Sequence, residues 1–303
     1  MNVTGTVYLV GAGPGAPDLL TLRAAELLRR ADVVFYDALV HPDTIALADK
    51  AEKVAVGKRC GSPAVDWGQS DSVGKINSSM YAAASENAAS STRPSEVASQ
   101  RCWSPAPLSG AHSTAQRFIN KRLVDAARKY AVVVRLKGGD PMLFGRAQEE
   151  IDELEQHGID YQVVPGITAA LAASATVGVS MTRRGLSRNV TFVTPRRGAG
   201  EEGHDWAHSA MAADTCAIYM GVGEAAQIAD TLIARGASPD LPAVIVESAS
   251  LSGERRIAVR LADLGMAAAQ MITGPAVILL GEVYAQLQSR EVVAEPLVRS
   301  RIA

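Results

Sequence analysis

The chain has 303 residues, of which 48% are hydrophobic and 20% charged, and its formal net charge is -2. This length and hydrophobic content allow a sizeable core and two domains, and they exclude a globally disordered chain. The near-neutral charge argues against a nucleic-acid-binding protein. No apolar run reaches the length of a membrane span, and the N-terminus lacks the features of a secretory signal. We therefore expect a cytoplasmic protein that binds neither nucleic acid nor a membrane.

Cysteine and histidine spacing gives no metal signal. Cys60, Cys102 and Cys216 have neither the spacing of a zinc site nor that of a disulfide framework, which suits a reducing compartment. His204 and His208 stand four apart and could share one helical face, but no third ligand is evident. We expect a surface helix there, and no metal.

The first half alternates β-branched apolar runs with segments of helical periodicity. Strands are predicted at residues 7–10, 32–36, 54–56, 132–136 and 161–164. Helices are predicted at 17–30, 43–48, 115–129, 146–157 and 168–177. Between them, residues 62–110 are rich in Ser, Ala, Asn and Pro and lack periodicity, so they are predicted to form a flexible insertion.

The second half repeats the alternation. Strands are predicted at residues 190–194, 215–220, 244–247, 255–259 and 276–281, and helices at 205–211, 224–235 and 261–270. Ser252-Gly253 indicates a hairpin between two of these strands. We therefore predict two α/β domains, at residues 1–183 and 184–285, followed by a loose tail at 286–303.

Glycine-bearing turns directly follow four of the predicted strands. These turns are Gly11–Gly15, Lys137–Pro141, Pro165–Ala169 and Met220–Gly221. Each could be an ordinary connection between a strand and a helix. Four of them together favour one ligand along one edge of a sheet, because ligands of open α/β sheets lie outside the carboxyl ends of the strands.

A nicotinamide-dependent oxidoreductase is an alternative. Gly11, Gly13 and Ala16 fit the dinucleotide fingerprint, and Asp37 falls where an acidic residue would bind the ribose. Against this, Pro14-Gly15 interrupts the turn where helix N–H groups would face a pyrophosphate. The other three glycine turns also have no role in that scheme.

Eight segments, in this order, resemble those of the tetrapyrrole methylases. They read VYLVGAGPG, ADVVFYDALV, VGKR, VVRLKGGDPMLFGR, VVPGITAA, IYMG, VIVES and GPAVILLGEV. The resemblance that rests on them extends over roughly residues 7–284, apart from the insertion. The resemblance implies two α/β domains with S-adenosylmethionine (SAM) in the cleft between them, and a homodimer. It is strongest toward the methylases of uroporphyrinogen III, and it implies no metal.

The resemblance also implies site residues. For SAM these are Pro14, Gly138, Gly139, Asp140, Leu143, Thr168, Ala169, Met220, Ala249, Pro275 and Ala276. Because SAM has no phosphate, the glycine loops would serve close backbone approach rather than anion binding. Asp140 could pair with the hydroxyls or the ammonium of the ligand. Ala249 departs from the family, whose members usually carry glycine there.

The catalytic residues implied by the resemblance are Asp37, Lys58, Glu149, Arg146 and Arg184. Asp37 and Lys58 match proposed acid-base residues, and Glu149 matches a glutamate proposed as a base. Arg146 and Arg184 match arginines suited to the carboxylates of the macrocycle. Lys137, Arg59 and Arg183 could add positive charge to that site.

The implied reaction methylates uroporphyrinogen III at C2 and C7 to give precorrin-2, which leads to sirohaem and cobalamin. A methylase of a later corrin precursor is an alternative within the family. A tetrapyrrole carrier without catalytic activity is another, because the insertion at 62–110 interrupts the chain beside the expected substrate cleft.

Overall fold

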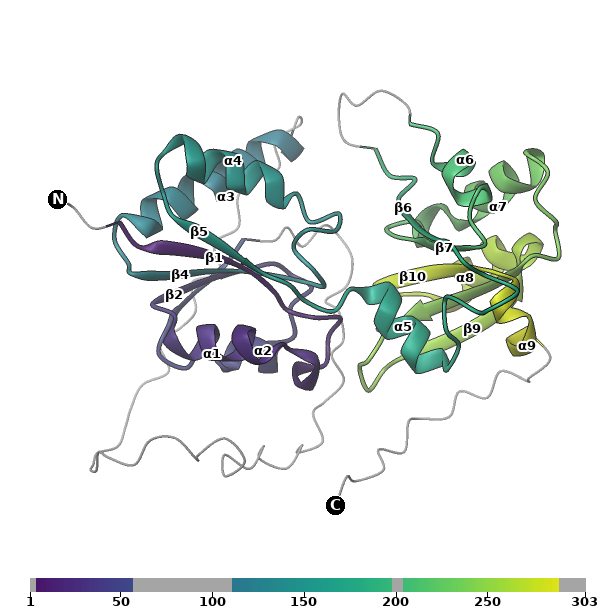
Figure 1. Cartoon of the computed structure of the whole chain (residues 1–303), viewed down its shortest axis with the longest axis horizontal. Coiled ribbons are helices and arrows are strands. Elements are labelled where there is room, and N and C mark those ends of the chain that lie inside the picture. Colours follow the sequence, from purple (N-terminus) through teal and green to yellow (C-terminus); the bar gives the residue numbers. More distant parts are fainter. Residues whose placement is uncertain (1–3, 57–110, 198–203, 289–303) are drawn as a thin grey trace, which may run out of the picture.

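The computed structural model describes residues 4–56, 111–197 and 204–288. These residues form two five-stranded sheets, one from each half of the chain (Figure 1). The predicted insertion at 62–110 and most of the predicted tail lie outside the described residues. Residues 286–288 of that tail were wrongly expected to be loose, because they belong to helix α9 (Ala285–Gln288) and Gln288 donates a hydrogen bond to the Val259 carbonyl.

The first sheet is entirely parallel. Its order is β3-β2-β4-β1-β5. The strands are β1 (Thr6–Gly11), β2 (Val33–Tyr36), β3 (Glu52–Ala55), β4 (Val132–Lys137) and β5 (Tyr161–Val164). The apolar runs of β1, β2 and β4 are largely buried on both faces, as central parallel strands require, whereas the edge strands β3 and β5 are partly exposed.

Helices cover the first sheet from opposite sides (Figure 1). Leu27 and Leu28 of α1 (Leu22–Arg30) pack on one face, with Ile45 of α2 (Pro42–Ala46) beside them. On the other face lie α3 (Ala111–Ala127) and α4 (Ala147–Gln156). The loops after the neighbouring strands β1 and β4 therefore leave toward opposite faces. Such a point is where open α/β sheets bind ligands.

The second sheet is mixed, with the order β6-β7-β10-β8-β9. Only β6 and β7 run parallel to each other. The strands are β6 (Val190–Val193), β7 (Thr215–Ile218), β8 (Pro242–Glu247), β9 (Arg255–Arg260) and β10 (Ala276–Gly281). The β8–β9 pair confirms the expected hairpin.

The helices of the second half lie mainly on one face of its sheet. They are α6 (Trp206–Met211), α7 (Ala225–Ala234) and α8 (Leu264–Met271). The opposite face is covered by α5 (Ala169–Val177), whose alanines contact β8 and β10. Because α5 follows β5 directly in the chain, it links the two sheets. Its small side chains allow the close packing.

The first predicted helix is divided. Residues 17–30 form a short turn (Pro17–Leu19) and then α1, because Leu20 and Thr21 are extended. The Thr21 side chain accepts a hydrogen bond from the Ala24 N–H and so begins α1 as an N-cap. Helix α1 therefore begins well after the glycine turn. This leaves no helix N-terminus beside Gly13 of the kind that the dinucleotide fingerprint requires.

Candidate active site

The loops after β1 and β4 are joined by a pair of glycines. Gly13 and Gly139 exchange backbone hydrogen bonds, with N···O distances of 3.2 and 2.7 Å. Both have left-handed backbones, with φ of 74° and 70°, which glycine adopts without steric cost. The two loops are therefore held together at the carboxyl edge of the first sheet.

Two other glycines have a different role from the one we expected. A Cβ on Gly11 would lie 2.6 Å from the Gly166 Cα, and one on Gly166 would lie 2.3 Å from the Gly139 carbonyl oxygen. The space that a Cβ would need at either glycine is already occupied by backbone atoms of a neighbouring loop. Gly11 and Gly166 thus allow three loops to pack on one another, rather than a ligand to approach.

Two carboxylates connect these loops further. Asp37 accepts hydrogen bonds from the Gly138 N–H at 3.3 Å and the Leu39 N–H at 3.1 Å. Asp140 accepts from the Met142 N–H at 2.8 Å and the Gly166 N–H at 2.9 Å. A carboxylate has about four lone-pair sites, so each can still accept from a ligand.

Tyr219, at the end of β7, connects the second sheet to this edge. Its hydroxyl lies 2.7 Å from Thr168 Oγ1 and accepts a hydrogen bond from the Ala170 N–H at 3.0 Å. Its ring lies 5.2 Å from that of Phe144, in the loop after β4. Burial raises the pKa of Tyr219, although these hydrogen bonds oppose the shift. Sequence analysis missed this residue, although the IYMG segment contains it.

The loop after β8 completes the arrangement. Ser250 Oγ accepts a hydrogen bond from the Ala16 N–H at 3.1 Å, and the Ser248 N–H donates to the Pro275 carbonyl at 2.9 Å. Ser248 and Ser250 have positive φ, but Ala249 between them does not. Alanine therefore fits a position where family members usually carry glycine.

The other predicted cofactor residues lie on these same loops. Pro14 and Leu143 are half-buried, Ala169 is the first residue of α5, and Ala276 is the first residue of β10. Met220 is 44% exposed and has a left-handed backbone. The structure thus brings the loops carrying the predicted cofactor residues to one region.

Arg146 and Glu149 form an exposed bidentate ion pair, with N···O distances of 2.6 and 2.7 Å. Arg146 precedes α4 in a left-handed conformation. Its guanidinium is therefore already bound to the neighbouring carboxylate. A substrate carboxylate would have to share or replace that partner.

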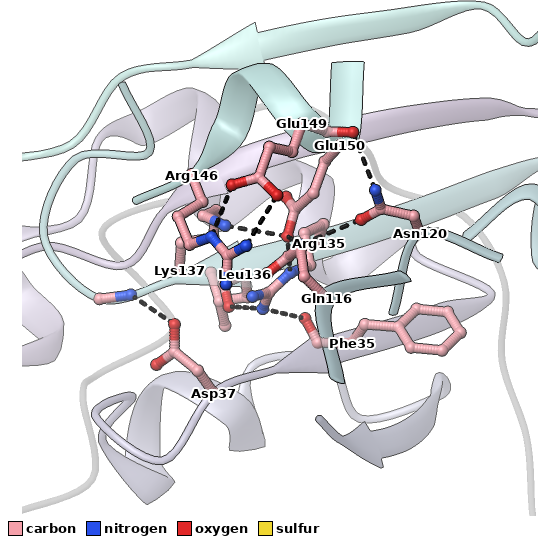
Figure 2. A network of polar contacts seen from close by, with 11 residues as sticks. Phe35, Asp37, Gln116, Asn120, Arg135, Leu136, Lys137, Arg146, Glu149 and Glu150 are labelled. Carbon is pink, nitrogen blue, oxygen red and sulfur yellow. Dashed lines mark hydrogen bonds and ion pairs between the residues drawn. The ribbon is translucent and has the colours of Figure 1, made fainter. Parts of the chain in front are cut away.

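Beneath this pair lies a buried charged network (Figure 2). Glu150 is fully buried, and its Oε1 accepts hydrogen bonds from Gln116 at 3.1 Å, Arg135 at 3.1 Å and Lys137 at 3.0 Å. Its Oε2 has no hydrogen-bond partner among the described residues. The network joins the end of β4 to the first turn of α4, and so fixes both ends of the loop that carries Gly138–Arg146.

The environment of Lys137 differs from the sequence expectation. We expected Lys137 to add positive charge to the substrate site, but only 4% of the residue is exposed. Burial lowers the pKa of Lys137, and Arg135 lowers it further, whereas Glu150 and Asp37 raise it. Lys137 therefore belongs to the scaffold of the site.

Two of the predicted residues are not described by the structure, and a third makes no polar contact with the described parts of these loops. Lys58 and Arg59 lie outside the described residues. Arg184 lies in an exposed turn that Arg183 and Ser187 close through backbone hydrogen bonds. Within the described ranges, no hydrogen bond or ion pair connects the Arg184 side chain to the loops above.

The described ranges show neither a cluster of metal ligands nor a membrane span. The described residues contain no group of three or more His, Cys, Asp or Glu side chains placed to hold a metal ion. His208 lies in α6, and His204 precedes that helix. None of the described helices is long and apolar enough to cross a membrane.

Two α/β halves joined through loops at the carboxyl edge of a parallel sheet agree with the family resemblance. The family model described as Tetrapyrrole (Corrin/Porphyrin) Methylases matches residues 6–265, and the chain belongs to this family. The fold class expected from the sequence is thereby confirmed.

Two curated relatives are informative. A uroporphyrinogen-III C-methyltransferase of Pseudomonas aeruginosa is 35% identical over 296 residues, which cover 97% of this chain and 98% of that protein. A siroheme synthase of Chromobacterium violaceum is 39% identical over 92% of this chain but only 49% of that protein. The chain thus spans about half the length of the siroheme synthases that it matches.

Solved structures resemble the whole chain. A uroporphyrin-III C-methyl transferase from Thermus thermophilus, complexed with S-adenyl homocysteine, has a TM-score of 0.68 and 35% identity, covering 93% of this chain and all of that one. A cobalt precorrin-4 methyltransferase has a TM-score of 0.67 and 25% identity, covering 92% and 95% of the two chains.

The residues present at the site fit SAM. A Cβ on Gly139 would meet only the Thr168 Cα, at 3.9 Å, so the space beside this backbone is open. Asp140 is half-buried and retains acceptor capacity for an ammonium or a hydroxyl. Ala249 supplies a buried apolar surface near Pro275.

Proposed function

We propose that this protein transfers methyl groups from SAM to uroporphyrinogen III, at C2 and C7, and so forms precorrin-2. The observation that carries the proposal is that loops from both halves are bonded together: Ser250 accepts from the Ala16 N–H in the loop after β1, and Tyr219 bonds to Thr168 in the loop after β5. Support comes from the P. aeruginosa methyltransferase, which aligns over nearly its whole length. The T. thermophilus relative was crystallised with S-adenyl homocysteine.

In this proposal SAM contacts the loops at the joined edge. The cofactor residues are Pro14, Gly138, Gly139, Asp140, Leu143, Thr168, Ala169, Met220, Ala249, Pro275 and Ala276. Asp140 accepts from the hydroxyls or ammonium of the ligand, while Pro275 and Ala276 lie near the adenine. SAM, when bound, supplies the methyl group.

The protein contributes position and proton transfer. Holding two reactants in attack geometry removes several kcal/mol of barrier, roughly 7–11 at most. Asp37, Lys58 and Glu149 are the proposed acid-base residues that take up the proton released as the double bonds of the macrocycle shift. Arg146 and Arg184 bind carboxylates of the macrocycle, since a guanidinium binds a carboxylate through two hydrogen bonds.

The decisive experiment is an anaerobic incubation with SAM and uroporphyrinogen III, followed by mass spectrometry of the tetrapyrrole. A product heavier by two methyl groups supports the proposal. A reaction without SAM and one with the Asp37→Asn variant serve as controls. If the mass does not change although SAM binds, the substrate assignment is wrong.

A methylase of a later corrin precursor is the second candidate. The fit to the cobalt precorrin-4 methyltransferase, with nearly the same TM-score as the T. thermophilus enzyme, favours it. The same mass measurement, made with precorrin-2 and later precursors as substrates, distinguishes the two. We also propose that the protein is a homodimer, which sedimentation analysis would test. Its proposed location is the cytoplasm.

The cofactor placement has its own test. Asp140→Ala removes the acceptor that spans Met142 and Gly166, so affinity for S-adenosylhomocysteine should fall by about tenfold, the value of one hydrogen bond to a charged group. Asp152→Ala, an exposed change on α4, is the matched control. Calorimetric titration measures both, and an unchanged affinity in Asp140→Ala would contradict the placement.

A further inference from the structure

A cavity of about 250 Å³ opens at the carboxyl end of β6. Two aromatic residues, Phe144 and Phe192, form part of its wall. Its polar lining consists of Thr191, Thr194, Arg196, Arg197, His204 and Ser209. The cavity therefore combines cationic groups and hydroxyls with aromatic surface. None of these residues is among the catalytic and cofactor residues proposed above.

The cavity is continuous with the proposed cofactor loops through the ring of Tyr219. That ring lies 5.2 Å from Phe144 and 6.1 Å from Phe192. On its other side, the Tyr219 hydroxyl bonds to Thr168. Phe144 also belongs to the loop after β4, two residues before Arg146. The loop that carries Arg146 therefore forms part of the cavity wall through Phe144.

Backbone strain supports a functional role for Phe144. Its φ is 53°, a left-handed conformation that is unfavourable for a bulky residue. The strained residue is 39% exposed and presents its ring to the cavity wall. Conformations of this kind persist where the surrounding structure holds a side chain in place for binding.

The two arginines of the cavity have no anionic partner among the described residues. Arg196 and Arg197 are exposed and form no ion pair there, whereas Arg135, Arg235 and Arg255 all do. Residues 198–203, between Arg197 and His204, lie outside the described ranges and take no part in the inference. Two such guanidiniums beside a hydroxyl-lined cavity suit a carboxylate ligand.

We infer that this cavity is a subsite for the carboxylate arms of the substrate. Arg196 and Arg197 bind the carboxylates, and Phe144 contacts the pyrrole ring that carries them. The inference rests on the proposed function, because it is the tetrapyrrole that supplies the carboxylates. A volume of about 250 Å³ lies below the range of whole-ligand pockets, roughly 300–1,000 Å³, so the cavity takes part of the macrocycle only. Arg196 and Arg197 thereby determine selectivity for acidic side arms.

The test compares an Arg196→Gln/Arg197→Gln double variant with the wild-type protein. Loss of two charge-assisted contacts should raise the KM for uroporphyrinogen III by about tenfold or more, with kcat changed less than about threefold. Affinity for S-adenosylhomocysteine should stay unchanged. Arg188→Gln is the matched control, because Arg188 is an exposed arginine at the opposite end of β6.

A binding measurement makes the test independent of turnover. Fluorescence titration with uroporphyrin, which carries acetate and propionate arms, is compared with coproporphyrin, whose acetates are replaced by methyl groups. The wild-type protein should prefer uroporphyrin, and the double variant should lose most of that preference. Arg188→Gln should retain it.

The outcomes separate this inference from the function it rests on. If the wild-type protein methylates uroporphyrinogen III and the double variant has the same KM and the same porphyrin preference, the subsite is wrong and the function stands. If the double variant also loses affinity for S-adenosylhomocysteine, the arginines act through the fold, which overturns the subsite. If the wild-type protein neither binds nor methylates the tetrapyrrole, the proposed function and the subsite are both wrong.

Discussion

In the part of the chain that the structure describes, each half contains one buried glutamate that holds a loop of the candidate site, and the two do so differently. Glu150 in the first half receives three side-chain donors on one oxygen, two of them from the buried cations Arg135 and Lys137. Glu247 in the second half accepts the Thr273 N–H at 2.7 Å and the Gly274 N–H, and its other oxygen binds Arg255.

The comparison shows that the charge of the carboxylate matters most for Glu150, whereas its position as a hydrogen-bond acceptor matters most for Glu247. Glu150 compensates the charge of cations that have no access to water, so its own charge is essential. Glu247 serves chiefly as an acceptor for backbone N–H groups just before Pro275, and the side chain of its cation Arg255 is 41% exposed. Its charge is therefore less critical than its position.

Glu150→Gln should have the largest effect. It leaves Arg135 and Lys137 buried without an anion, which costs about 3–5 kcal/mol of unfolding free energy. Urea denaturation measures the loss, and Glu153→Gln, on the exposed side of α4, should change little. Adding Lys137→Met to Glu150→Gln should recover part of the loss, because one unpaired charge is removed. A loss below about 1 kcal/mol in Glu150→Gln would show that charge compensation is unimportant here.

Glu247→Gln should cost less, about 1.5–3 kcal/mol, because the amide oxygen can still accept from the backbone while the ion pair is lost. Affinity for S-adenosylhomocysteine should also fall, since the loop before Pro275 loses its anionic anchor. Arg255→Gln is the control and should cost less than about 1 kcal/mol, as expected for a partly exposed pair. If Glu247→Gln and Glu150→Gln cost the same, the distinction between the two carboxylates fails.

Tyr219→Phe tests whether the two halves of the site act together. The variant keeps the aromatic contacts but loses the hydroxyl that joins Thr168 and the Ala170 N–H, which should cost about 1 kcal/mol. A decrease of a few-fold in S-adenosylhomocysteine affinity should accompany it. Tyr161→Phe, which removes an exposed hydroxyl bonded to Glu155, should leave that affinity unchanged. Equal effects of the two variants would argue against coupling.

The smallest effect concerns an exposed ion pair. Hydrogen bonds from Arg235 and the His208 N–H hold the pKa of Asp205 below its usual value of 3.8. This stabilisation is present above the unfolded-state pKa and is lost as the pH falls through the lowered folded-state pKa. Asp205→Asn should therefore lower the melting temperature slightly at pH 6 and not at strongly acidic pH. A difference between variant and wild type that persists in acid would contradict the assignment.

Local sequence patterns predicted most of the fold. Apolar runs such as Val132–Leu136 and Val244–Glu247 fell within observed strands, because burial on both faces leaves a strong compositional signal. The break at Leu20-Thr21 was missed, since its neighbours keep helical spacing on both sides. The antiparallel placement of β10 between β7 and β8 depends on contacts between distant segments, which a local pattern does not contain.

The site was predicted less completely. Family resemblance pointed to the loops, but it did not identify Tyr219, whose contact with Thr168 spans 51 residues of sequence. Glu150 could have been found from periodicity: it shares the buried face of α4 with Ala147, Ile151 and Leu154, where a carboxylate requires a buried partner. The roles of Lys58 and Arg184 stay predictions.

Each sheet is built from one uninterrupted stretch of the chain, with β1–β5 first and β6–β10 second. In the described residues the connection between the sheets runs once, through α5 and the exposed turn at Arg184–Leu186. A cut in that turn would yield two fragments that each keep a whole sheet, while the loops of the candidate site would be divided between them. The protein is therefore suited to fragment complementation, because α5 would stay with the first fragment and reassembly would restore both its packing on the second sheet and the divided site.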